Sequence, residues 1–280
     1  MSGLPRGLYE QLVTKGLEDA LATLDPRHRA QREALHPEEA ADRLAFHLAA
    51  LVRRSVAALE AGKRIEVGLK LADEVIRLLA TGSKGIDEAD ALATSGDVLR
   101  AIAALRPDGR PEAVTLPATP LLDTTLLTNA PGEPHIGFQL NSEISSADRI
   151  DLLMAFVRRT GIRPMLDLLR RHVDEGRPLR LLTTTYTNST ELAALEVLRK
   201  LGAEIKVSYD TTSTRLHAKA WLFHRHSGFS TAYIGSSNLT HSAQVSGLEW
   251  NVRVSGARNP DVIDKFSAVF ESYWHNADFR

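Results

Sequence analysis

The chain has 280 residues, of which 43% are hydrophobic and 25% are charged, enough apolar material for two ordinary globular domains. It contains no cysteine, which excludes disulfides, thiolate nucleophiles and zinc held by cysteine. The formal net charge of -1 excludes a global attraction to polyanions, so nucleic-acid binding would require a local basic patch.

The N-terminal third of the sequence has a helical pattern. Apolar residues recur at helical spacing from Leu8 to about Leu105, which predicts a small all-α domain over residues 1–105, with helices over 37–59 and 63–79. Residues 1–10 do not resemble a secretory signal, and no apolar run reaches the roughly 20 residues of a membrane span. We therefore expect a cytoplasmic protein that does not engage membranes.

The pattern changes after a proline-rich stretch, and residues 106–120 are interpreted as a linker. An extended entry segment around 121–127 precedes alternating strands and helices over 149–157, 161–174, 179–185 and 189–201. Strands over 204–209, 216–223, 231–234 and 248–254 follow, and a helix over 260–274 comes last. This order predicts an α/β domain over 121–280, with a mixed β-sheet flanked by helices.

A basic stretch lies within the first part of this predicted domain. Four acidic residues accompany its eight arginines, which are Arg149, Arg158, Arg159, Arg163, Arg170, Arg171, Arg177 and Arg180. The stretch is either a binding patch for a polyanion or a solvated helix face of mixed charge. The sequence favours neither interpretation.

A histidine and a lysine stand two residues apart in a predicted strand that is otherwise apolar. Side chains at positions i and i+2 share one face of a strand, so His217 and Lys219 are predicted to project together. A lysine in such a segment needs an anion to offset its desolvation, and a substrate phosphate would serve. An internal carboxylate partner, or a lysine stem that extends to water, is the alternative.

The next segments add short polar groups and a carboxylate. A strand ends at Gly235, after which Ser236 and Asn238 offer hydrogen-bonding side chains. Glu249 follows eleven residues later inside a predicted strand, and His217 is its expected partner.

These residues together resemble a known motif. The order His217-x-Lys219, Gly235-Ser236-x-Asn238 and Glu249 resembles the half-motif of the phospholipase D superfamily over roughly residues 121–279. The whole chain resembles the phospholipase D-like region that precedes bacterial DEAD/DEAH-type helicases. An aspartate usually stands seven residues after the histidine, where this chain has His224, and nuclease members without that aspartate are known.

The resemblance implies a metal-independent phosphodiesterase that acts on nucleic acid with no cofactor. DNA is favoured over RNA as the substrate, but the sequence leaves both open. His217 would attack phosphorus, Lys219 and Asn238 would hold its non-bridging oxygens, and Glu249 would orient the imidazole. A second His-x-Lys is absent from the chain, so a homodimer would supply the second histidine to a shared site. A fused or associated helicase is a further expected partner.

Other residues are weaker candidates. Thr185 and Tyr186 end a predicted strand and could contact the substrate, although hydroxyl capping of a helix is the simpler interpretation. Glu143 is a candidate lining residue of the same pocket. His224 and His226 share a strand face but have no third metal ligand at a fitting spacing, so we expect no metal site. At least two of the three tryptophans are expected in the core.

Two other functions compete with the nuclease. A catalytically weak module could keep the phosphate pocket and position a helicase on nucleic acid, which the missing aspartate and near-neutral charge favour. A lipid phosphodiesterase is disfavoured, because the lipid enzymes usually carry two motifs in one chain and no amphipathic membrane-binding helix is evident here.

Overall fold

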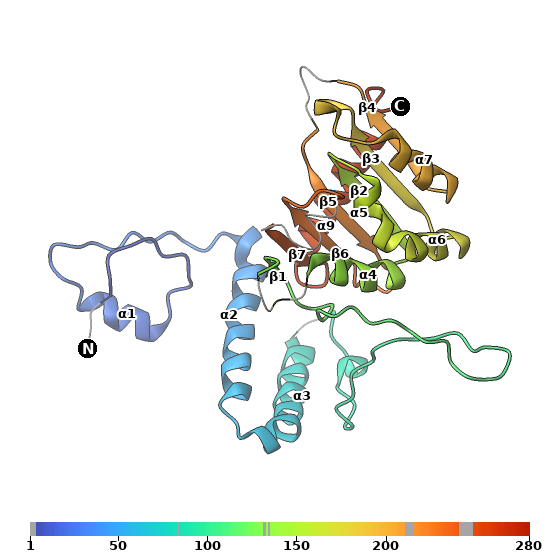
Figure 1. Cartoon of the computed structure of the whole chain (residues 1–280). Coiled ribbons are helices and arrows are strands. Elements are labelled where there is room, and N and C mark those ends of the chain that lie inside the picture. The colour runs from blue at the N-terminus through green and yellow to red at the C-terminus, as the bar shows by residue number, and fades with distance from the viewer. Residues whose placement is uncertain (1–3, 83, 131–132, 134, 211–215, 241–248) are drawn as a thin grey trace. The chain divides into compact units, whose positions relative to one another are not determined.

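The computed structural model describes residues 4–82, 84–130, 133, 135–210, 216–240 and 249–280 (Figure 1). The chain divides into two compact units, Met1–Arg100 and Ala101–Arg280. None of the helices in the described ranges combines the length and apolar character that a bilayer crossing requires.

The first unit is helical, as the sequence predicts. Its α-helices are α1 (Lys15–Ala22), α2 (Pro37–Ala57) and α3 (Arg64–Gly82). Pro37 occupies the first turn of α2, where its missing N–H costs nothing, and two glutamates follow it. The helical spacing continues to Leu105 in the sequence, but the described residues 91–105 form no helix. The three helices contain no buried residue in the described part of the chain, so they do not form a closed bundle core.

The second unit is built on one mixed sheet, which confirms the predicted α/β class. Its strands are β1 (Thr125–Leu127), β2 (Arg149–Met154), β3 (Leu179–Thr184), β4 (Glu204–Ser208), β5 (Lys219–His224), β6 (Thr231–Gly235) and β7 (Asn251–Ser255). They lie in the order β1-β7-β6-β5-β2-β3-β4. The strands β2, β3 and β4 are parallel, and every other neighbouring pair is antiparallel.

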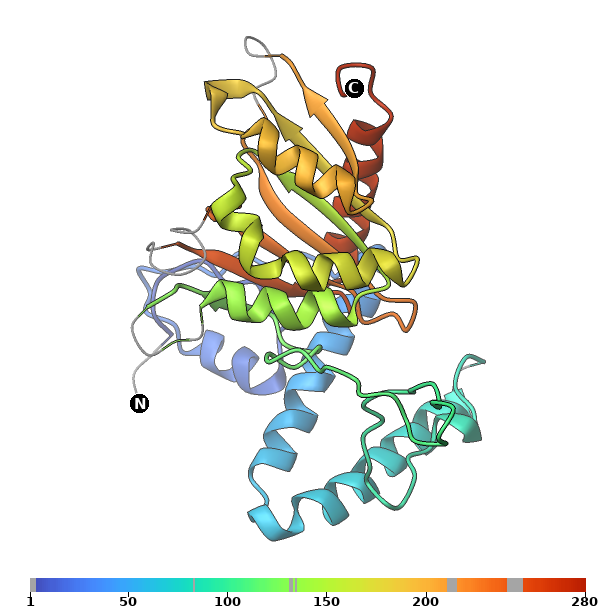
Figure 2. The ribbon, with the colours of Figure 1, turned by 45° about the vertical axis from the view of Figure 1, so that its right-hand side comes forward.

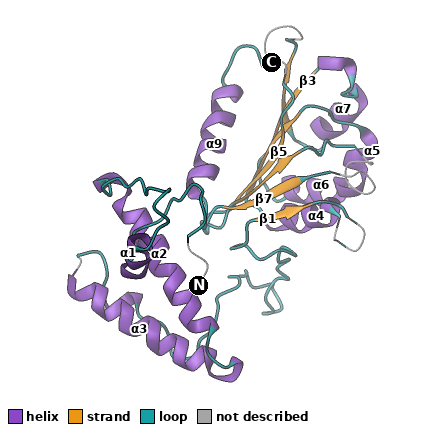
Figure 3. Cartoon of the chain, turned by 90° about the vertical axis from the view of Figure 1, so that its left-hand side faces the viewer, coloured by secondary structure: helices purple, strands orange, loops and turns teal. Residues whose placement is uncertain are grey.

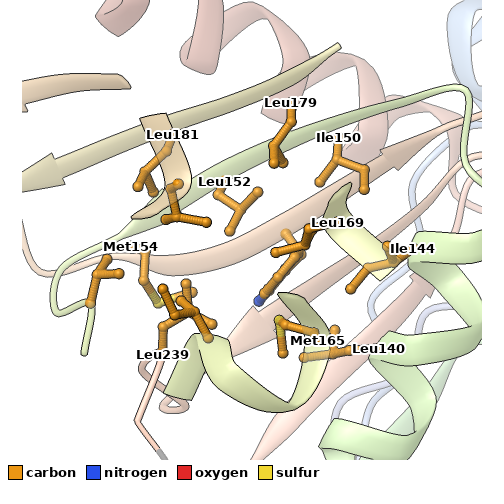
Figure 4. Packing of buried hydrophobic residues seen from close by; sticks show 14 of the residues in the cluster. Leu140, Ile144, Ile150, Leu152, Met154, Met165, Leu169, Leu179, Leu181 and Leu239 are labelled. Carbon is orange, nitrogen blue, oxygen red and sulfur yellow. The ribbon is translucent and has the colours of Figure 1, made fainter. Parts of the chain in front are cut away.

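Helices cover both faces of the sheet (Figures 2 and 3). One face carries α4 (Ile136–Ser146), α5 (Arg159–Ile162), α6 (Leu166–Asp174) and α7 (Leu192–Lys200), and the other carries α9 (Pro260–Trp274). The larger core lies under α4, α6 and α7 (Figure 4). A smaller core beneath α9 includes Phe270 and Trp274. Trp221 and Trp274 are buried and Trp250 is exposed, which confirms the expectation for the tryptophans.

Several predicted elements differ from the observed ones at their ends. The strand expected over 149–157 ends at Met154, and the strand expected over 216–223 begins only at Lys219. The helix expected over 161–174 is divided by a 3₁₀ turn at Arg163–Met165, because Pro164 lacks the N–H that a continuous helix would use. The helix α4 was not predicted at all.

A buried ionic network holds α4 on the sheet. The Glu143 carboxylate accepts hydrogen bonds from Arg225 (2.6 Å), Thr231 (2.8 Å), Tyr233 (3.0 Å) and Arg253 (2.8 Å). Burial alone would raise the pKa of Glu143, but the two guanidinium groups outweigh it and hold that pKa below its ordinary value. The carboxylate therefore stays ionised between two strands and a helix.

The strand register brings four strand ends to one edge of the sheet. Met154, at the end of β2, pairs with Lys219, at the start of β5. Gly235, at the end of β6, pairs with Asn251, at the start of β7. The loops that carry the predicted motif residues therefore leave the sheet at the same edge.

Candidate active site

His217 and Lys219 lie side by side, as their spacing predicts, although His217 precedes β5 and does not belong to it. The Lys219 ammonium donates a hydrogen bond to the carbonyl of His217 (2.8 Å) and lies 3.1 Å from Nδ1 of its ring. The ring of Phe156 packs edge-on against the His217 ring, with centroids 5.7 Å apart. His217 is exposed and Lys219 is 9% exposed. The His217 ring is therefore accessible to solvent, and the Lys219 ammonium group beside it is largely buried.

The environment of Lys219 favours an anionic ligand. Burial lowers the pKa of Lys219, and the negative charge of Glu249 acts in the opposite direction. Within the described ranges, its Nζ atom contacts His217 and forms no ion pair with a carboxylate. An anion placed against Lys219 would offset the cost of keeping this ammonium charged.

The loop after β6 places Asn238 next to the same phenylalanine. A Cβ atom at Gly235 would lie 2.2 Å from the carbonyl oxygen of Trp250, so only glycine fits where this loop leaves the strand. The amide oxygen of Asn238 accepts a hydrogen bond from the Phe156 N–H (3.2 Å). This bond orients the side chain and leaves its Nδ2 donors without a partner among the described residues.

Glu249 has a different partner from the one predicted. It precedes β7, and its carboxylate accepts a hydrogen bond from the Ser236 hydroxyl, whereas the sequence pattern suggests His217. The reason is the β6–β7 pairing, because Ser236 N–H donates to the carbonyl of Trp250 (3.0 Å) and so sets Ser236 beside Glu249. Glu249 acts on the site through its charge near Lys219.

The structure gives other contacts to the remaining candidates. The Thr185 N–H donates to the carbonyl of Ser208 (3.1 Å), and the Tyr186 N–H donates to the hydroxyl of Thr184 (3.0 Å). Neither of these contacts involves His217. Glu143 is fully buried within the network under α4, which corrects its predicted role as a lining residue of the substrate pocket.

The histidines at 224 and 226 lie away from the site. His224 is at the far end of β5 from Lys219, where its ring bonds to Asp151 (2.7 Å). Arg180 also holds Asp151 (2.8 Å), so His224 belongs to a structural ion network. His226 is exposed in the turn that follows.

Some residues of this region have no counterpart in the sequence prediction. Buried Ser237 accepts a hydrogen bond from Asn251 (2.7 Å), which joins the loop after β6 to the start of β7. The first residue of α4, Ile136, lines a small cavity of about 10 Å³ together with Lys219 and Asn238. The exposed imidazole of His135 therefore stands at the same end of the sheet. Ser237 lies within the Gly235-to-Asn238 segment that the sequence singles out, whereas no sequence signal marked Asn251, Ile136 or His135.

Part of the second unit is similar to a known protein family. Residues 140–274 match the family model described as "Cardiolipin synthase, PLD-like domain". The match spans β2 to β7 of the second unit. No curated protein matches the chain.

Solved structures are similar to part of the chain at low sequence identity. Nuc from Salmonella typhimurium, a phospholipase D family member, is 17% identical with a TM-score of 0.42, over 56% of this chain and 97% of its own. NucT from Helicobacter pylori is 15% identical with a TM-score of 0.41, over 54% and 94%. Polyphosphate kinase from Porphyromonas gingivalis is 16% identical with a TM-score of 0.41, over 59% and 30%.

Proposed function

We propose that the phospholipase D-like domain is a metal-independent phosphodiesterase that cleaves nucleic acid, DNA rather than RNA, through a phosphohistidine. The observation that carries this proposal is the contact between the exposed His217 ring and the covered Lys219 ammonium, with Asn238 anchored to the adjoining Phe156. A nucleophile next to two fixed donors fits displacement at a phosphate.

The first step forms a nitrogen–phosphorus bond. One ring nitrogen of neutral His217 attacks phosphorus, and the bond from phosphorus to one ester oxygen breaks. Lys219 and the Nδ2 donors of Asn238 hold the non-bridging oxygens, whose negative charge grows in the pentavalent state. Glu249 supports this step by favouring the charged form of Lys219, which burial opposes.

Both steps need another proton carrier. In the first step a second histidine, protonated, gives its proton to the leaving alkoxide; in the second step it takes a proton from the water that attacks phosphorus, while the nitrogen–phosphorus bond breaks. We assign this role to His217 of a second copy in a homodimer, because one chain carries a single His-x-Lys motif. His135 is the alternative within one chain, because it directly precedes Ile136, which lines the same small cavity as Lys219.

Cleavage is expected to persist in excess chelator, because Lys219 and Asn238 would stabilise the negative charge on the phosphate oxygens that a metal ion would otherwise neutralise. The measurement is hydrolysis of fluorescent single-stranded and duplex DNA and of RNA, with and without EDTA. Loss of all cleavage on chelation, restored by a divalent metal, would refute metal independence. Tight DNA binding with no cleavage under any condition would favour the targeting-module alternative.

Activity is also expected to require pairing of subunits. Wild-type protein refolded with about a tenfold excess of His217→Ala subunits is predicted to lose most of its activity per wild-type chain, because nearly all wild-type subunits then share a site with one histidine. An unchanged activity per wild-type chain, together with inactivity of His135→Ala, would instead assign the proton carrier to His135. Sedimentation at the assay concentration gives the oligomeric state independently.

The link to a helicase remains a prediction from the resemblance. It is tested by whether a DEAD/DEAH-type helicase is encoded beside this chain or joined to it, and whether the purified chain binds and stimulates that helicase. If no helicase binds, the proposed hydrolysis of phosphodiesters is not contradicted.

A further inference from the structure

The eight arginines of the basic stretch separate into two groups. Four of them form ion pairs with acidic residues, namely Arg149 and Arg180 with Asp151, Arg170 with Asp167, and Arg177 with Glu175. The other four are exposed and have no acidic side-chain partner among the described residues, and three of these lie together at Arg158, Arg159 and Arg163. We call these three the α5 arginines.

The α5 arginines adjoin the candidate active site. Phe156, which contacts the His217 ring and anchors Asn238, precedes Arg158 by two residues. The Arg158 N–H donates to the carbonyl of Leu239 (2.9 Å), directly after Asn238. The α5 backbone also packs closely here, because a Cβ atom at Gly161 would lie 2.1 Å from the same carbonyl oxygen. The backbone that carries the arginines is thus fixed to the loop that carries Asn238.

The spacing suits a chain of phosphates. The backbone is extended at Arg158, so about 7 Å separates its Cα atom from that of Phe156, which is comparable to the distance between neighbouring phosphates of an extended nucleic-acid strand. Arg159 and Arg163 are four residues apart, which places them on one side of the short helix. The Glu191 carboxylate accepts a hydrogen bond from the backbone N–H of Arg159 (2.9 Å), but no ion pair joins it to the three guanidinium groups in the described part of the chain. Their positive charges therefore remain available to an anion.

We propose that the α5 arginines bind the phosphates that flank the scissile phosphate of a polynucleotide. Guanidinium groups suit this task because they donate paired hydrogen bonds to phosphate oxygens. A lipid headgroup or other single phosphodiester has no flanking phosphates and would not engage these residues. The inference rests on the proposed function and specifies its substrate as a chain longer than one phosphodiester.

The test compares substrates of different length. The triple variant R158Q/R159Q/R163Q is expected to lose at least about tenfold in kcat/KM on a single-stranded oligonucleotide of about 12 nucleotides, but under about threefold on thymidylyl-thymidine. The slope of log(kcat/KM) against log salt should fall in magnitude by about 2, since each lost phosphate contact on a single strand contributes about 0.7. The matched control R170Q/R171Q, on α6, should keep the wild-type length dependence and salt slope.

Failure of this inference is distinct from failure of the proposed function. Equal length dependence and equal salt slope in the wild type and the triple variant would overturn the role of the α5 arginines while cleavage stands. If the wild type cleaves neither substrate, the proposed function fails. Fluorescence anisotropy with the same oligonucleotide then decides the inference, because weaker binding by the triple variant supports it and equal dissociation constants overturn it.

Discussion

Replacing His217 with alanine is expected to lower kcat/KM for nucleic-acid cleavage by at least about 10⁴-fold, or roughly 5 kcal/mol of transition-state stabilisation. The loss is large because the substitution removes the atom that bonds to phosphorus, and water at the same position is neither fixed nor as nucleophilic. Steady-state hydrolysis of a fluorescent oligonucleotide measures this effect.

The structure provides a matched control for that loss. His226 is also exposed, and it lies in the turn after β5, at the end of that strand away from Lys219. His226→Ala should retain wild-type activity. Both variants should unfold at the wild-type temperature, because neither removes a buried side chain. A His217→Ala protein that keeps more than about a tenth of wild-type activity would rule out nucleophilic attack by this residue.

Replacing Glu143 with glutamine is expected to reduce the free energy of unfolding by about 3 to 5 kcal/mol at pH 7. The glutamine keeps the shape but leaves Arg225 and Arg253 buried without an anion. The control is Glu175→Gln, which breaks the exposed pair with Arg177 and should cost less than about 1 kcal/mol. Urea unfolding followed by circular dichroism gives both values. Equal stability of the two variants would contradict the account of the network.

The same network predicts how stability depends on pH. The pKa of Glu143 is lower in the folded chain than its ordinary value of 4.5, because the guanidinium charges outweigh the effect of burial. Its stabilising contribution is therefore complete above that ordinary value and is lost as the pH falls through the folded value. The stability difference between wild type and Glu143→Gln should shrink when unfolding is repeated near pH 3.5. If the stability difference instead grows on acidification, the pKa of Glu143 is not lowered by folding.

The sequence predicted correctly those features that depend on residues close to one another in the chain. The helix over Pro260–Trp274 matches the prediction at both ends, because a proline starts it and its apolar residues recur at helical spacing. The pairing of His217 with Lys219 also follows from spacing alone. The helix α4 was missed because its three serines have low helix propensity, while its stability depends on packing of Ile136, Leu140 and Ile144.

Contacts between distant parts of the sequence were not predictable from spacing. Glu143 binds Arg225 and Arg253, which follow it by 82 and 110 residues, and only the folded sheet brings them together. The pairing of Glu249 with Ser236 depends in the same way on the register of β6 and β7. Sequence alone proposed several residues of the candidate site, but the only contact among them that it predicted and the structure contains is that of His217 with Lys219.

The most direct test of the central claim is to trap the covalent intermediate. Wild-type protein mixed with excess oligonucleotide and quenched in alkali within the first turnover should carry a phosphate-linked nucleotide fragment on His217, found by mass spectrometry of the digested chain. The adduct should disappear in acid, in which phosphohistidine hydrolyses, and should be absent from His217→Ala. Rapid cleavage with unmodified His217 at every quench time, or an adduct on another residue, would contradict the account.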